Sequence, residues 1–111
     1  MGKGRVEEIR EKVKKFKDSI RKKFFVNEII IFGSAAKGKM SRHSDVDIIV
    51  VSQKYGRKDV FKIVPELYRE WHEKQKIGYP VDIMLFNIKE FNKLKKEVSI
   101  VSEALREGIR I

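Results

Sequence analysis

Apolar residues near the start of the chain recur every three or four positions: Val6, Ile9, Val13, Phe16, Ile20 and Phe24. This spacing is typical of one face of an α-helix, so we predict an amphipathic helix over about residues 5–23. Asn27 ends the pattern. The β-branched run that follows, Glu28–Phe32, predicts a short buried strand.

A polar loop, Gly33–Ser44, separates that strand from a second predicted strand, Asp45–Val51. After a turn at residues 55–56, helical spacing returns at Val60, Val64, Leu67 and Trp71, which predicts a second amphipathic helix. We expect the aromatic side chains of Phe61, Tyr68 and Trp71 to lie in the core. Pro65 lies inside this second helix and removes one helix hydrogen bond, so we expect a kink or a restart there.

The last third of the chain predicts one more strand and two helices. Pro80 can open a strand, which Val81–Phe86 supplies. Asn87 followed by Glu90 is a capping box, which starts a third helix. A last helix is predicted over about 98–107, with Gly108 as its stop.

The order of these elements predicts the fold class. A helix lies between the second and third strands, and such a crossover favours a parallel pair. We therefore expect an α/β fold, a small sheet with helices packed against it. The 111 residues suit one domain, 1–111.

Composition limits the kinds of partner and of cellular compartment that we expect. The net charge of +10 favours anionic partners such as nucleotides, nucleic acid or an acidic protein. The chain has no cysteine, which excludes disulfides and thiolate metal sites and fits a reducing cytoplasm. No apolar run is long enough to span a membrane, and the first residues lack the apolar core of a secretory signal.

Two aspartates head the second strand, and a third heads the next one. Side chains alternate along a strand, so Asp45 and Asp47 share a face. If the third strand is parallel and adjacent, Asp82 reaches the same place. Mg²⁺ prefers such oxygen donors, and two such ions clamp an in-line phosphoryl displacement.

The loop before these aspartates suits a phosphate group. Gly33 lets the backbone approach a phosphate closely, and consecutive N–H groups there can form an anion-binding nest. The Ser34 hydroxyl can donate to a phosphate oxygen, while Lys37 and Lys39 add positive charge. His43 is interpreted as a polar loop residue. Each motif alone is more often a plain turn or a solvated strand edge, and the combination is what predicts a metal–phosphate site.

These residues resemble the DNA polymerase beta-type nucleotidyltransferase superfamily. Its signature is Gly-Ser, a loop, Asp-x-Asp and a later Asp, which here are Gly33-Ser34, Asp45-Val46-Asp47 and Asp82. The short length is similar to that of the minimal nucleotidyltransferases of prokaryotes.

The resemblance implies a mixed sheet with flanking helices, a nucleoside triphosphate such as ATP, and two Mg²⁺ ions, for which Mn²⁺ can substitute. By position, Gly33, Ser34 and Lys37 would bind the nucleotide. Asp45, Asp47 and Asp82 would be the catalytic residues and the metal ligands, with Asp82 helping to deprotonate the acceptor hydroxyl.

Many members of this group are paired with a HEPN-type toxin, and some transfer AMP to a tyrosine of it. The resemblance makes that antitoxin activity the first hypothesis. A non-catalytic antitoxin and a nucleic-acid-binding module are the alternatives. Ala35 stands where relatives often carry Arg or an aromatic residue, and Lys37 where Arg is common. In that same loop, Lys39 and Met40 replace residues that are often smaller or acidic.

Overall fold

The computed structural model describes residues 2–40 and 44–111, with side chains from residue 5 onward. Four strands form one sheet in the order β3-β2-β1-β4: β1 (Val26–Phe32), β2 (Val46–Ser52), β3 (Val81–Asn87) and β4 (Ile109–Arg110). Strands β2 and β3 run parallel, whereas β1 is antiparallel to both β2 and β4. The predicted α/β class and the mixed sheet are confirmed.

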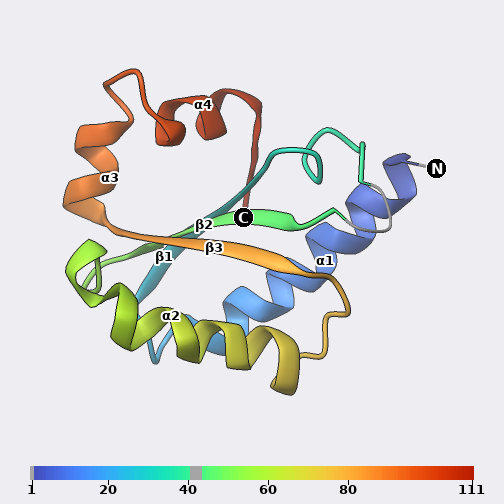
Figure 1. Cartoon of the computed structure of the whole chain (residues 1–111), viewed down its shortest axis with the longest axis horizontal. Coiled ribbons are helices and arrows are strands. Elements are labelled where there is room, and N and C mark those ends of the chain that lie inside the picture. The colour runs from blue at the N-terminus through green and yellow to red at the C-terminus, as the bar shows by residue number, and fades with distance from the viewer. Residues whose placement is uncertain (1, 41–43) are drawn as a thin grey trace.

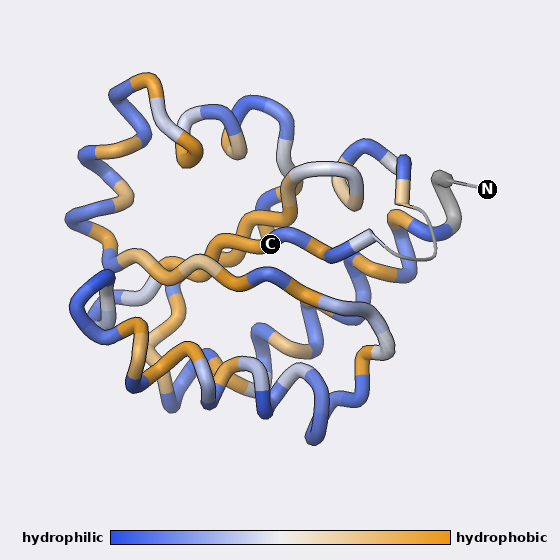
Figure 2. Tube along the Cα trace, in the orientation of Figure 1, coloured by the Kyte–Doolittle hydropathy of each residue, from blue (hydrophilic) through white to orange (hydrophobic). Residues whose placement is uncertain are grey.

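Helices cover both faces of this sheet (Figure 1). One face packs against α1 (Gly2–Ile20) and α2 (Val60–Arg69), and the other against α3 (Ile88–Leu94) and α4 (Ile100–Glu107). Apolar residues concentrate along the strands, and hydrophilic residues dominate the outer helix surfaces (Figure 2). Among the helices in the described residues, none combines the length and apolar character that a bilayer crossing requires.

The core between α1 and the π-helical segment η2 (Glu70–Lys74), which directly continues α2, is aromatic. Phe16 and Trp71 are both fully buried and meet edge to face, with ring centroids 5.1 Å apart. The indole Nε1 of Trp71 donates a hydrogen bond of 2.8 Å to the carbonyl of Tyr79. This arrangement buries a large apolar surface without leaving the indole N–H unpaired.

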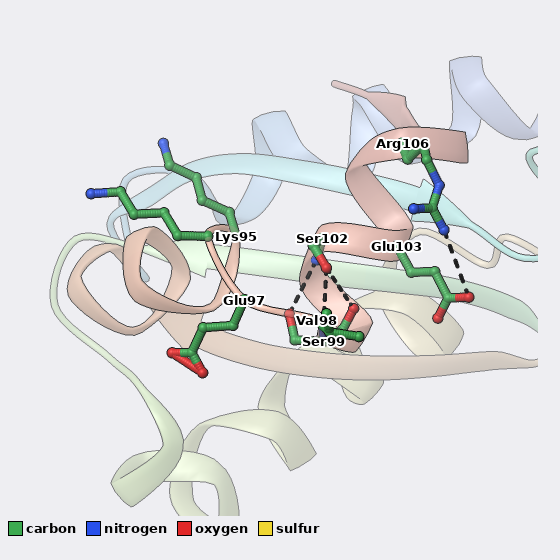
Figure 3. A pocket seen from close by; sticks show the side chains of 8 residues that line it. Lys95, Glu97, Val98, Ser99, Ser102, Glu103 and Arg106 are labelled. Atoms are coloured by element: carbon green, nitrogen blue, oxygen red, sulfur yellow. Dashed lines mark hydrogen bonds and ion pairs between the residues drawn. The ribbon is translucent and has the colours of Figure 1, made fainter.

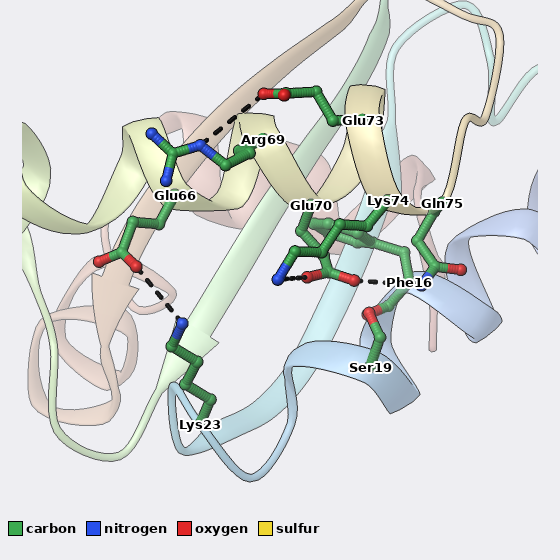
Figure 4. Close-up of polar contacts among 9 residues, drawn as sticks. All are labelled: Phe16, Ser19, Lys23, Glu66, Arg69, Glu70, Glu73, Lys74 and Gln75. Carbon is green, nitrogen blue, oxygen red and sulfur yellow. Dashed lines mark hydrogen bonds and ion pairs between the residues drawn. The ribbon is translucent and has the colours of Figure 1, made fainter.

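Polar contacts border this core but add little to it. Lys23 pairs with Glu66 at 3.4 Å between the end of α1 and α2, and Arg69 pairs with Glu73 along the second helix (Figure 4). All four side chains are more than a third exposed. Exposed ion pairs contribute about 0–1 kcal/mol, so apolar packing holds these helices together.

Several predicted boundaries move by a few residues. The first helix ends at Ile20 rather than near 23. A turn follows, in which Phe25 is left-handed and the N–H of Val26 donates to the Arg21 carbonyl, and this turn leads the chain into β1. The first strand begins at Val26, which pairs with Ser52 at the end of β2. The second strand begins at Val46, so Asp45 directly precedes it.

Two expectations for the second helix, a restart at Pro65 and a core position for Phe61, are wrong. Helix α2 continues through Pro65 without a restart. Proline removes only its own N–H, and the carbonyl this frees belongs to Phe61, which lies on the solvent side. Phe61 is 96% exposed, so it is not a core residue, whereas Trp71 is buried as predicted. Tyr68 is half-buried, and its hydroxyl accepts a hydrogen bond from the N–H of Ile83.

The C-terminal segment also differs in detail. Helix α4 begins at Ile100 rather than at 98, because the Ser99 hydroxyl caps it by accepting from the N–H of Ser102. Gly108 ends the helix as predicted, in an extended conformation. The two residues after it form β4, which the sequence pattern did not predict because two residues are too few to show an alternation.

Candidate nucleotide and metal site

Asp47 and Asp82 lie in register on the parallel strands β2 and β3. Asp47 stands between the buried residues Val46 and Ile48, which face α1 and α2. Asp82 stands in the same way between the buried residues Val81 and Ile83. Side chains alternate along a strand, so both carboxylates project from the other face, the one that carries α3 and α4. The predicted parallel pairing therefore brings Asp82 beside Asp47.

The negative charge at this point of the sheet is concentrated. Asp47 is half-buried, and its pKa is raised, first by that burial and then by the charges of Asp82 and Asp45. Asp45 and Asp82 are exposed. In the part of the chain that the structure describes, no lysine or arginine forms an ion pair with any of the three. Such a cluster attracts a cation.

The fit to Mg²⁺ rests on the chemistry of the donors. Among residues 2–40 and 44–111, no three His, Cys, Asp or Glu side chains are grouped closely enough to hold a metal ion by themselves. Mg²⁺ does not need such a cage, since it keeps several waters and commonly uses one or two carboxylates plus substrate phosphates. Carboxylates on two adjacent strands fit that mode of binding.

Gly33 packs directly against this cluster. It follows β1 with a φ of +70°, and a Cβ built on it would lie 2.6 Å from Oδ2 of Asp47. Only glycine adopts this conformation without strain and leaves room for the carboxylate. The Gly-Ser turn and Asp47 therefore form one continuous site.

The residues after Gly33 form tight turns like the start of a helix. The N–H of Lys37 donates to the Gly33 carbonyl at 3.3 Å, and that of Lys39 to the Ser34 carbonyl at 2.9 Å. Within the described residues, the N–H groups of Ala35 and Ala36 donate to no backbone carbonyl. Unpaired N–H groups in such a turn can receive an anion.

The side chains of this loop have partners of their own. Lys37 pairs with Glu107, at the end of α4, with 3.1 Å between Nζ and Oε2. The Ser34 hydroxyl contacts the Met40 sulfur at 3.8 Å, which is a weak hydrogen bond. Ala35 is 1% exposed, so its methyl group belongs to the core. His43 lies outside the described residues.

A groove of about 130 Å³ adjoins Gly33, lined by residues of β1 and α4: Phe32, Gly33, Ile100, Glu103, Ala104 and Glu107. A hollow of about 540 Å³ lies instead at the junction of α3 and α4, around Ser99, Ser102 and Arg106 (Figure 3). Its lining contains none of the motif residues. Charge pattern alone gave no reason to expect Glu107 near Lys37, because their contact depends on where α4 ends.

Comparison with known proteins identifies the family. The family model described as "Polymerase beta, Nucleotidyltransferase" matches residues 14–107. The chain belongs to this nucleotidyltransferase family. The matched residues of this nucleotidyltransferase domain include the Gly33-Ser34 turn and all three aspartates.

The fold is similar to the crystal structure of a candidate nucleotidyltransferase from Sulfolobus solfataricus. The TM-score is 0.58 at 21% sequence identity, over 98% of this chain and 80% of that chain. At this identity the likeness shows the fold of the nucleotidyltransferase domain. No curated protein matches the sequence.

Proposed function

We propose that this nucleotidyltransferase domain transfers a nucleoside monophosphate, AMP from ATP, to a hydroxyl group with the help of Mg²⁺. The observation that carries this proposal is the register pairing of Asp47 with Asp82 beside the Gly33-Ser34 turn. Carboxylates and an N–H-rich turn side by side suit a metal-bound triphosphate better than either feature alone.

Each motif residue has a role in this proposal. The turn after Gly33 and the Ser34 hydroxyl receive the outer phosphates, and Lys37 adds a positive charge. Mg²⁺, two ions when the site is loaded, would be held by Asp45, Asp47 and Asp82 and would offset the charge of the phosphates. The acceptor oxygen bonds to the α-phosphorus, the bond to the leaving pyrophosphate breaks, and Asp82 takes the acceptor's proton.

The acceptor we propose is a tyrosine of a HEPN-type partner protein, with the domain acting as its antitoxin. The family resemblance supports this choice, and the net charge of +10 suits an acidic partner. A non-catalytic antitoxin is the second candidate. It is favoured by the buried Ala35, which leaves no cation at that position, and by the pairing of Lys37 with Glu107.

The test is incorporation of labelled AMP into the protein encoded next to this one, with ATP and Mg²⁺ in excess. We expect transfer by the wild type and a steep loss with Asp82→Asn, since general-base assistance is worth roughly 10²–10⁴-fold. Equal rates would remove Asp82 from the reaction. No transfer by the wild type to a verified partner would favour the non-catalytic antitoxin.

A further inference from the structure

A second surface lies at the end of the sheet where β1 begins and β2 ends, away from Asp47 at the start of β2. The rings of Phe25 and Tyr55 lie 6.2 Å apart there, tilted by 59°. The ammonium group of Lys54 stands 5.2 Å from the first ring centroid and 5.3 Å from the second. We call Phe25, Lys54 and Tyr55 the aromatic–basic end.

Phe25 has an unusual backbone. Its φ is +55°, a left-handed conformation that is rare for a bulky residue. Its side chain is nevertheless 44% exposed, so burial of the ring is not what compensates for the strain. This left-handed residue ends the helical turn that follows α1, where the N–H of Val26 donates to the carbonyl of Arg21 at 3.0 Å. Here the N–H of Gln53 holds the Phe25 carbonyl at 2.8 Å.

Further exposed cations lie in the chain segments next to these rings. In the described part of the chain, exposed cations without an ion pair come from the turn after α1, the turn after β2 and the segment that leads into α2: Arg21, Lys22, Lys54, Lys58 and Lys62. Lys23 is excluded because Glu66 neutralises it (Figure 4). Phe61, 96% exposed, stands between Lys58 and Lys62 in the sequence.

We propose that the aromatic–basic end binds single-stranded nucleic acid, with bases stacked on Phe25 and Tyr55 and phosphates near Lys54. Phe25 is exposed and Tyr55 is half-buried. Accessible rings beside cations without an ion pair are the combination that single-strand binders use, with little sequence preference. A duplex hides the faces of its bases, and an acidic protein would use the lysines without needing the rings. This surface and the aspartates lie at opposite ends of β2, so both can be occupied together.

The experiment is a fluorescence anisotropy titration with a labelled 12-nucleotide single-stranded RNA at several salt concentrations. Phe25→Gly removes the ring and accepts the left-handed backbone, and Tyr55→Leu and Lys54→Ala test the other two residues. Lys15→Ala is the matched control, because Lys15 is also an exposed lysine without an ion pair in the described residues but lies on α1. Thermal melts show that each variant is folded.

We expect Phe25→Gly to weaken binding about tenfold or more, as loss of one stacked base does. Lys54→Ala should weaken it a few-fold and reduce the salt slope by about 0.7, the value for one lost phosphate contact on a single strand. Lys15→Ala should bind the RNA as tightly as the wild type does. The wild type should bind a duplex of the same sequence more weakly. Wild-type affinity in both aromatic variants, or an equal loss in Lys15→Ala, would overturn the proposal. So would equally tight binding of the duplex or of polyglutamate.

Discussion

The backbone of Gly33 packs directly against the carboxylate of Asp47, since a Cβ at Gly33 would lie 2.6 Å from Oδ2 of that aspartate. The contact joins the turn that suits phosphate to the carboxylate that suits a metal ion. Neither group can shift far without displacing the other, which explains why one small side chain matters to the whole site.

Gly33→Ala should therefore damage binding as well as stability. The positive φ should cost about 1–2 kcal/mol in unfolding free energy, and the added methyl group should displace the Asp47 carboxylate. Gly78→Ala is the matched control, because Gly78 also has a positive φ, of +85°, but nothing lies within 4 Å of its Cβ position. Denaturant melts should show similar losses of stability in both variants. Binding of Mg²⁺ with ATP should fall only in Gly33→Ala, and equal binding in the two would contradict the account.

Asp47 should destabilise the metal-free fold at neutral pH. Its pKa in the folded state is raised above the ordinary value of 3.8, by burial, Asp82 and Asp45 in that order. Between 3.8 and the raised pKa, the folded chain binds more protons than the unfolded chain, so stability falls as pH rises through this window.

Asp47→Asn should remove that pH-dependent loss. Thermal melts without divalent ions should show the variant more stable than the wild type at pH 7, by no more than a few degrees. The two should converge as the pH falls below 3.8, where Asp47 is protonated in both states. A large loss of stability at pH 7 would mean that the carboxylate supports the fold instead.

Glu107 should compete with phosphate for Lys37, whose ammonium it holds at 3.1 Å. Glu107→Gln frees that ammonium, so affinity for Mg²⁺ with ATP should rise by up to about fivefold, the range of an exposed ion pair. Glu103→Gln is the matched control, because Glu103 lines the same groove but pairs with Arg106. If Glu107→Gln and Glu103→Gln have the same affinity for Mg²⁺ with ATP, Lys37 has no contact with the nucleotide.

Much of the arrangement follows from local sequence patterns. The β-branched runs predicted three of the four strands, and the crossover helix predicted that β2 and β3 are parallel. That one relation brings Asp82 to Asp47. The capping box at Asn87 and Glu90 was predicted from two residues, because its hydrogen bonds span one turn.

Features that depend on distant contacts were not predicted. The ion pair of Lys37 with Glu107 and the strand β4 exist only because α4 returns the chain to β1. Phe61 is a large apolar residue, yet it lies in solvent, because it stands beside the apolar stripe of the helix and not within it. The left-handed backbone of Phe25 could not be predicted from its residue type, because phenylalanine rarely adopts a positive φ.

The most direct test of the site is calorimetric titration of ATP with Mg²⁺ into three proteins: the wild type, Asp47→Asn and Asp18→Asn. Asp18 is exposed on α1, so its replacement changes the net charge equally without touching the site. We predict that the wild type and Asp18→Asn bind alike and that Asp47→Asn binds about tenfold more weakly or not at all. Equal binding by all three would show that Asp47 holds no metal-bound nucleotide and would contradict the account.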